Sequence, residues 1–96
     1  GGDRATVKTY QIKRSVVEAA YWDGSPKCAD AIIEWAGALV ERTLSGSGLR
    51  VYTPESAPTV KVGEWIVKDG DGNFFPCSPA LFNWLRSDAQ KMDSWP

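Results

Sequence analysis

The chain has 96 residues, of which eleven are basic, twelve are acidic and none is histidine, and its formal net charge is −1. This length fits one domain and leaves no room for two. A balanced charge without a block of one sign disfavours sequence-independent binding to nucleic acid. No apolar run approaches the ~20 residues that cross a bilayer, so we expect no membrane partner and a reducing, cytosolic setting.

The two ends of the chain differ in composition from its middle. The sequence starts with Gly1 and Gly2 in place of Met, so we interpret residues 1–9 as a flexible N-terminus or tag scar. Residues 10–86 carry the patterned apolar positions and are predicted to form a single α+β domain. Residues 87–96 are mostly polar and are predicted to form a C-terminal tail.

The first predicted element is one strand from Tyr10 to Trp22. Its second half, residues 16–22, is rich in β-branched and aromatic residues, and the turn pair Asp23-Gly24 follows it. Apolar residues fall on both faces of this stretch. We therefore expect an interior strand whose two faces are both covered.

A helix is predicted over residues 26–36. Ser25 is a good N-cap, Pro26 suits the first helical position, and Gly37 is a plausible C-terminal stop. Five residues recur at helical spacing and form one apolar stripe: Cys28, Ala29, Ile32, Trp35 and Ala36. Within that stripe Cys28 is interpreted as a small buried hydrophobe.

Two hairpins are predicted in the middle of the chain. Residues 38–44 and 49–53 read as strands joined by the Gly-rich loop 45–48. Residues 60–62 and 65–67 flank Gly63-Glu64, where we expect a bulge or bend. The segment 69–73 (Asp-Gly-Asp-Gly-Asn) is dense in turn residues and precedes a strand at Phe74-Phe75.

A second helix is predicted after Ser78-Pro79, and it completes the fold. Ala80, Leu81, Trp84 and Leu85 fit one helical face that would close onto the core, with Phe82 beside it. The predicted fold class is α+β, with a mostly antiparallel sheet of about five strands packed against one main helix and a second C-terminal helix.

The residue types present lead us to expect no catalytic residue, no metal site and no cofactor. Nucleophilic catalysis of the serine or cysteine type needs a nearby base, most often His, and this chain has none. Cys77 lies just before a predicted helix N-terminus, where the pKa of a thiol falls, but a structural role at that corner is the preferred interpretation. The acidic turn that starts at Asp69 resembles a calcium loop, yet its twelfth position is Ala80 and not a carboxylate.

Three motifs resemble those of a widespread family of small tailed-bacteriophage proteins of unknown function. They are Val-Val-Glu-Ala at residues 16–19, followed by Trp22; Gly-Glu-Trp-Ile-Val-Lys at 63–68; and Phe-Pro-Cys-Ser-Pro at 75–79. The match spans about residues 10 to 84. Ser15, Glu64 and Phe75 depart from residues usual in the family. The resemblance implies a phage origin and no established activity.

The leading functional hypothesis is a phage accessory protein that acts by binding. Its expected partner is a host protein in the host cytoplasm. It is expected to be a monomer or a weak homodimer and to bind no nucleic acid. Residues 84–95 are the candidate partner-binding element, with aromatic anchors Trp84 and Trp95 and polar contacts from Arg86 and Lys91. Three other functions stay open: a minor structural component of the virion, a small enzyme or metal-dependent factor, and a nucleic-acid-binding protein with a local basic face. The tail also has an alternative, in which Trp95 is frayed or folds back on its own domain.

Overall fold

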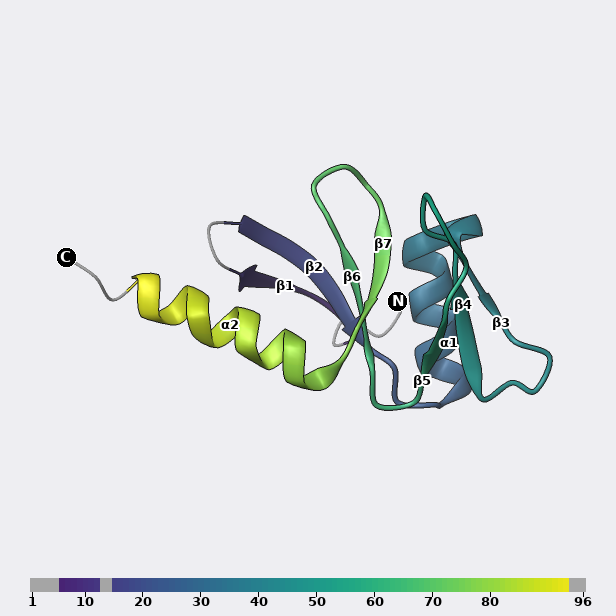
Figure 1. The fold of residues 1–96 in the computed structure, drawn as a ribbon. Helices are drawn as coiled ribbons and strands as arrows, with labels where there is room; N and C mark the ends of the chain where they lie inside the picture. The colour runs from purple at the N-terminus through teal and green to yellow at the C-terminus, as the bar shows by residue number, and fades with distance from the viewer. Residues whose placement is uncertain (1–5, 13–14, 94–96) are drawn as a thin grey trace.

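Seven strands, two α-helices and one short 3₁₀ helix make up the part of the chain that the computed structural model describes. Backbone is described for residues 6–12 and 15–93, and side chains within residues 6–12 and 16–86. The strands form two antiparallel sheets, as Figure 1 shows. The predicted α+β class, with a main helix and a C-terminal helix, is confirmed. The strands, however, divide into two sheets of four and three, whereas we predicted one of about five.

The four-stranded sheet has the order β1-β2-β6-β7, formed by β1 (Val7–Ile12), β2 (Ser15–Tyr21), β6 (Trp65–Lys68) and β7 (Phe74–Cys77). The three-stranded sheet has the order β3-β4-β5, formed by β3 (Val40–Arg42), β4 (Gly48–Val51) and β5 (Thr59–Lys61). Each strand pairs antiparallel with its neighbours, so the predicted hairpins β3–β4 and β6–β7 are both confirmed.

The first element was predicted wrongly as one strand from Tyr10 to Trp22. The chain instead forms two strands that pair antiparallel, with Ile12 opposite Ser15. The connection at residues 13–14 is Lys-Arg, which carries none of the Gly, Pro, Asn or Asp that signals a turn. Strand β1 begins at Val7, so part of the segment 1–9 that we set apart belongs to the sheet. Residues 1–5 lie outside the described residues.

Strand β2 is interior as predicted, because it lies between β1 and β6. The expectation that both its faces are covered holds at Ala19 and Ala20 but not along the whole strand. Ala19 and Ala20 are completely buried on opposite faces, whereas Val16 and Tyr21 are exposed. Because both side chains are small, the residues that pack on either face of the sheet can approach its backbone closely.

Helix α1 (Pro26–Ala36) begins and ends at the predicted residues. The Ser25 hydroxyl accepts a hydrogen bond from the Cys28 amide at 3.1 Å, which satisfies one of the amides that a helix start leaves unpaired. At the other end Gly37 has φ +62°, a conformation that glycine adopts without strain, and leads into the 3₁₀ turn η1 (Gly37–Leu39).

The larger core lies between α1, the three-stranded sheet and one face of the four-stranded sheet. Trp22 is its largest completely enclosed side chain, with 1% of its surface exposed. Its indole nitrogen donates to the Ser47 carbonyl oxygen at 3.3 Å. The other core members are aliphatic, aromatic or small: Ala20, Cys28, Ala29, Ile32, Ala36, Val40, Leu49, Val51, Val60, Ile66 and Phe74.

The bend expected at Gly63-Glu64 is confirmed, and it connects the two sheets. Strand β5 before it belongs to the three-stranded sheet and β6 after it to the four-stranded sheet. Gly63 has φ +96°, and its amide donates to the Trp22 carbonyl oxygen at 2.8 Å. This bend divides the strands between two sheets, because it redirects the chain after only three residues of β5.

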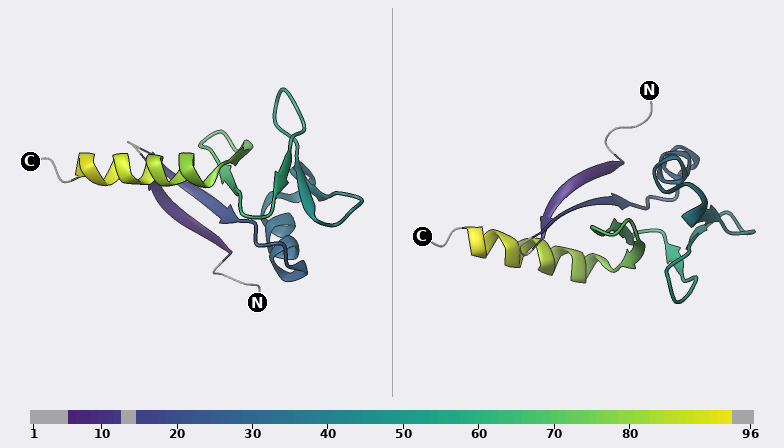
Figure 2. Two further views of the ribbon diagram at one scale, coloured as in Figure 1. Left: turned by 60° about the horizontal axis from the view of Figure 1, so that its bottom comes forward. Right: turned by 90° about the horizontal axis from the view of Figure 1, so that it is seen from above.

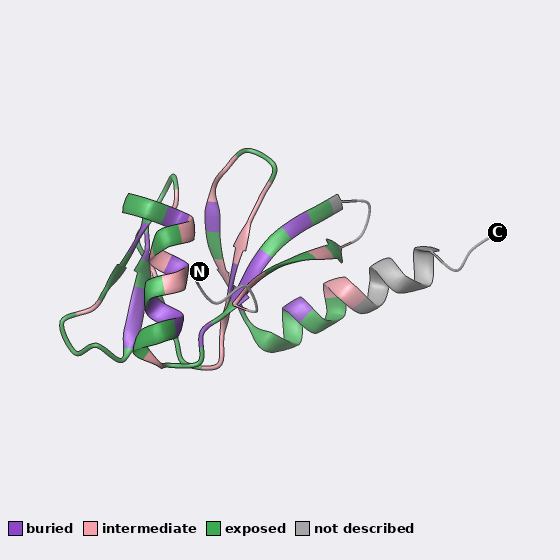
Figure 3. Cartoon of the chain, turned by 180° about the vertical axis from the view of Figure 1, so that it is seen from behind, coloured by how far each residue is buried: buried purple, intermediate pink, exposed green. Residues whose placement is uncertain are grey.

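The last element, α2 (Pro79–Asp93), covers the opposite face of the four-stranded sheet. Its C-terminal end extends past the strands in Figures 1 and 2. The segment 87–96 was predicted as a tail, but helix continues through Asp93. Figure 3 shows the buried residues concentrated where α1 and the two sheets meet.

Candidate functional site

Helix α2 starts where Ser78 caps it. The Ser78 hydroxyl accepts a hydrogen bond from the Leu81 amide at 3.2 Å, and its carbonyl oxygen accepts one from the Phe82 amide at 2.9 Å. Pro79 at the first helical position has no amide hydrogen to leave unpaired. The Ser-Pro pair therefore fixes the direction in which the helix leaves β7.

The inner face of α2 is held by an aromatic cluster. Phe82 is completely buried, and its ring stacks on that of Trp65 with centroids 4.1 Å apart. Tyr10 of β1 meets both rings edge to face, at 5.5 Å from Trp65 and 5.1 Å from Phe82. Edge-to-face and offset stacked pairs are the favourable aromatic arrangements. The cluster joins the first strand, the third strand of the sheet and the last helix.

The sequence placed the wrong residues of α2 against the core. Leu81 and Trp84 were expected to face inward, but they are 48% and 53% exposed, and Phe82 takes the buried position. Residues 81 and 84 lie on one side of the helix because they are three positions apart. The inner face is set by Phe82 because its ring fits between Tyr10 and Trp65, a tertiary contact that spacing along the helix does not reveal.

Arg86, predicted as a polar contact for a partner, belongs to the inner face as well. Its guanidinium carbon lies 4.9 Å from the centroid of the Tyr10 ring and 5.9 Å from that of Phe82. Cation–π contacts of this kind favour Arg over an aromatic face. Residues 84 and 86 are about 200° apart around a helix. The structure therefore does not bring Trp84 and Arg86 together.

The other two predicted partner residues are not placed by the structure. Lys91 lies within the helical backbone of α2, but its side chain is outside the described part, and Trp95 lies outside the described residues altogether. The candidate site that remains is the outer face of α2, defined by Leu81 and Trp84. Leu81 was not predicted as a surface residue, although its three-residue spacing from Trp84 is visible in the sequence.

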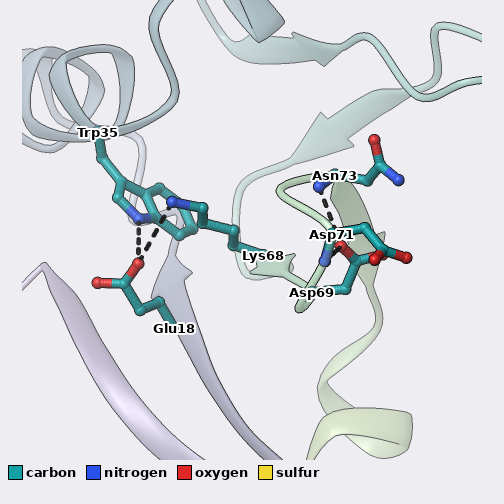
Figure 4. A network of polar contacts seen from close by, with 6 residues as sticks. All are labelled: Glu18, Trp35, Lys68, Asp69, Asp71 and Asn73. Carbon is teal, nitrogen blue, oxygen red and sulfur yellow. Dashed lines mark hydrogen bonds and ion pairs between the residues drawn. The ribbon is translucent and has the colours of Figure 1, made fainter.

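The acidic turn at residues 69–73 connects strands β6 and β7 of a hairpin. One carboxylate oxygen of Asp69 accepts hydrogen bonds from the amides of Asp71 and Asn73 at 2.9 and 3.0 Å, as Figure 4 shows. That oxygen is therefore directed at its own backbone. Among the described residues no group of three His, Cys, Asp or Glu side chains is arranged to hold a metal ion.

A second polar group lies at the rim of the larger core. Glu18 accepts a hydrogen bond from the indole nitrogen of Trp35 at 3.3 Å and lies 3.7 Å from the Lys68 ammonium (Figure 4). The Trp35 ring meets Phe74 edge to face at 4.8 Å. The Glu18–Lys68 pair is solvent-exposed, so its contribution to stability is small. The contacts with Glu18 and Phe74 together orient the Trp35 ring.

Neither cysteine has the surroundings of a reactive thiol. Both are buried, and they form no disulfide bond. Burial raises the pKa of the Cys77 thiol, which lowers the fraction present as the nucleophilic thiolate. The Cys28 sulfur donates to the Tyr21 carbonyl oxygen at 3.2 Å.

A hollow of about 440 Å³ lies between the 53–58 loop and β7. Its lining is rich in proline and hydroxyl residues: Thr53, Pro54, Glu55, Ser56, Pro58, Phe75 and Pro76. Glu55 is the one titratable side chain among them. Binding pockets usually combine apolar walls with several convergent polar groups. This hollow has apolar walls, with Glu55 as its single ionisable side chain.

Comparison with known proteins identifies neither a family nor a function for this chain. No family model, curated protein or solved structure matches this chain. No described helix has both the length and the apolar content that a bilayer crossing requires.

Proposed function

We propose that this chain is a small bacteriophage accessory protein that acts by binding a host protein in the host cytoplasm, without catalysis. The three sequence motifs at residues 16–22, 63–68 and 75–79 support the phage origin. The function rests on one observation, the outer face of α2. There Leu81 and Trp84 are about half exposed on a helix whose opposite face is fixed to the sheet.

Exposed aromatic side chains on a rigid element are the usual anchors of protein interfaces. Trp is enriched among the residues that dominate binding energy, because a large ring buries much area and loses little conformational entropy. Phe82 and Arg86 pack the inner face of α2 against Trp65 and Tyr10 of the sheet. Trp84 therefore lies on a surface that is already ordered before binding. Pre-ordering reduces the entropic cost of association.

The residue chemistry of the chain disfavours catalysis. The chain has no histidine, and the pKa of the Cys77 thiol is raised. The described carboxylates lie on turns, on loops, on strands β2 and β3 and on helix α1, and none of them is buried. A general base needs a position within hydrogen-bond reach of a bound substrate. The hollow at the 53–58 loop and the one lined by Thr43, Thr59 and Val62 each contain a single titratable side chain, Glu55 and Lys61 respectively.

Affinity capture tests this proposal. The immobilised chain is incubated with a bacterial lysate, retained proteins are identified by mass spectrometry, and the purified candidate is titrated against the free chain. Trp84→Ala is expected to weaken the interaction at least tenfold, as for an interface anchor. Leu44→Ala is the matched control, because Leu44 is fully exposed on the β3–β4 hairpin, away from α2.

Two results contradict the proposal. One is a partner that binds Trp84→Ala as tightly as the wild type. The other is a chain that retains no host protein and instead assembles with itself, which favours the alternative of a minor virion component. Sedimentation velocity over a range of concentrations distinguishes such assembly from the expected monomer or weak homodimer.

A further inference from the structure

Strand β1 is the longest edge strand in the part of the chain that the structure describes. It ends the order β1-β2-β6-β7 and has six residues, and β2 is its one strand neighbour in the described chain. The opposite edge, β7, contains Pro76, which has no amide hydrogen to donate. In the smaller sheet the edge strands β3 and β5 have three residues each. Among the described strands β1 therefore offers the most complete ladder to another strand.

The hydrogen-bond pattern shows which groups of β1 face outward. Trp22 donates its amide to the Glu64 carbonyl oxygen at 2.9 Å, so the even-numbered residues of β2 bond toward β6. Alternate residues of an antiparallel strand bond to opposite sides. The odd-numbered residues of β2 therefore bond to β1, where Ala19 lies opposite Lys8. It follows that Thr9, the next residue of β1, directs its amide and carbonyl away from β2.

The charge around β1 differs from the charge of the rest of the chain. Residues 4–14 contain four basic residues and no acidic residue, and β1 is the described centre of that segment. Residues 15–85 contain nine acidic and five basic residues. Within β1 itself Lys8 is exposed. An approaching strand is thus attracted to this edge when it is acidic.

Charged side chains on an edge strand also prevent the sheets of two identical molecules from pairing with each other. Lysine on an edge strand is one of the devices that prevent aggregation. The sequence around β1 is basic in every copy of this chain, and Lys8 is exposed on the strand itself, so the same charges disfavour a second copy. They favour an acidic segment, since opposite charges across strands stabilise pairing.

We propose that β1 takes up an extended, acidic segment of a partner protein, which adds to the four-stranded sheet as a fifth strand. The inference rests on the proposed function, namely that the chain acts by binding a protein. Strand addition gains affinity from main-chain hydrogen bonds and selectivity from the side chains of alternate residues. A nucleic acid would match the basic charge but cannot continue the backbone ladder that Thr9 begins.

A designed peptide tests the proposal directly. The probe is a fluorescein-labelled Glu-Val-Glu-Thr-Glu-Val-Glu peptide, and its counterpart has Lys in place of each Glu. Both are titrated with the wild-type chain at low ionic strength and followed by fluorescence anisotropy. We expect the acidic peptide to bind and the basic peptide not to bind. No binding of the acidic peptide overturns the proposal.

Substitution of Thr9 separates strand addition from charge attraction. Thr9→Pro removes the outward amide and leaves the β1–β2 bonds in place, whereas Thr9→Val keeps the amide. Because Thr9→Pro loses one backbone hydrogen bond and distorts the edge, its affinity for the acidic peptide should fall by about fivefold or more. The affinity of Thr9→Val should be unchanged. Lys8→Glu should also lower the affinity for the acidic peptide. This variant provides the test if Thr9→Pro does not fold. Equal affinity of Thr9→Pro and wild type, with both folded by circular dichroism, contradicts strand addition. Full affinity of Lys8→Glu contradicts the preference of the edge for an acidic segment.

Two further measurements distinguish the failure of this inference from the failure of the proposed function. A host protein retained equally by wild type and Thr9→Pro overturns strand addition and leaves the binding function standing. A labelled thymidine oligonucleotide that binds more tightly than the acidic peptide, with no effect of Thr9→Pro, overturns the inference in favour of nucleic acid. Retention of no host protein by the wild type contradicts the proposed function itself.

Discussion

The ring of Phe82 lies nearly parallel to that of Trp65, with an interplanar angle of 22° and centroids 4.1 Å apart. Phe82 comes from the last helix and Trp65 from the interior of the four-stranded sheet. This stack, with Tyr10 against both rings, is the main described contact that holds α2 to the sheet. The position of the outer face of α2 therefore depends on it.

Phe82→Ala should destabilise the protein by about 3–5 kcal/mol, because a completely buried ring is replaced by a cavity. Leu81→Ala, one residue away and about half exposed, should cost less than about 1 kcal/mol. Urea denaturation followed by tryptophan fluorescence measures both values. Equal losses for the two variants would show that α2 packs through a different face.

Gly48 and Thr59 should be coupled. A Cβ atom at Gly48 would lie 2.8 Å from Cγ2 of Thr59, and a β-branched side chain has little freedom to move aside. Gly48→Ala is expected to cost about 1–3 kcal/mol, the usual range for overpacking. Thr59→Ser removes that methyl group and should recover part of the loss. A double variant no more stable than Gly48→Ala would contradict this contact.

Both thiols should be protected in the folded protein. Cys28 and Cys77 are buried without a disulfide bond, and the pKa of the Cys77 thiol is raised. We expect a thiol reagent to label neither cysteine rapidly under native conditions and both in denaturant, and reductant to leave the Tm unchanged. A native mass two hydrogens below that of the reduced chain would instead indicate a disulfide bond.

The carboxylate of Asp23 should stabilise the fold only at pH values where it is ionised. Its carboxylate accepts the Ser25 amide at 2.8 Å, and hydrogen bonds from the Ser25 backbone and hydroxyl lower its pKa below the usual 3.8. A lowered folded-state pKa means that the contribution is complete above the unfolded-state pKa and disappears as the pH falls through the folded-state pKa. Asp23→Ala should therefore lower the urea midpoint slightly at neutral pH. The difference from wild type should narrow under acid conditions, and a difference that widens there would be contrary to this linkage.

The sequence predicted the elements with local signals and missed those set by long-range contacts. The Ser25 cap, the Gly37 stop and the 69–73 turn all depend on neighbouring residues, and each was located correctly. The β1–β2 hairpin was missed because Lys-Arg carries no turn signal. The inner face of α2 was misassigned because Phe82 is selected by Tyr10 and Trp65, which are distant in sequence.

The candidate site was predicted only in part for the same reason. Trp84 was predicted both to close onto the core and to begin the partner-binding element, and the structure shows it exposed. Arg86 was placed beside it, but the structure shows Arg86 over Tyr10. Residues two apart on a helix diverge, so a short linear segment such as 84–86 is not a surface.

Amide hydrogen exchange, with and without a captured host partner, tests the central claim most directly. If the chain binds through the outer face of α2 and the edge of β1, exchange should slow at residues 79–86 and at Thr9 when the purified partner is added. The β3–β4 hairpin around Leu44 serves as the internal reference and should be unchanged. Slower exchange confined to that hairpin or to the 53–58 loop, with α2 and β1 unaffected, would contradict the account.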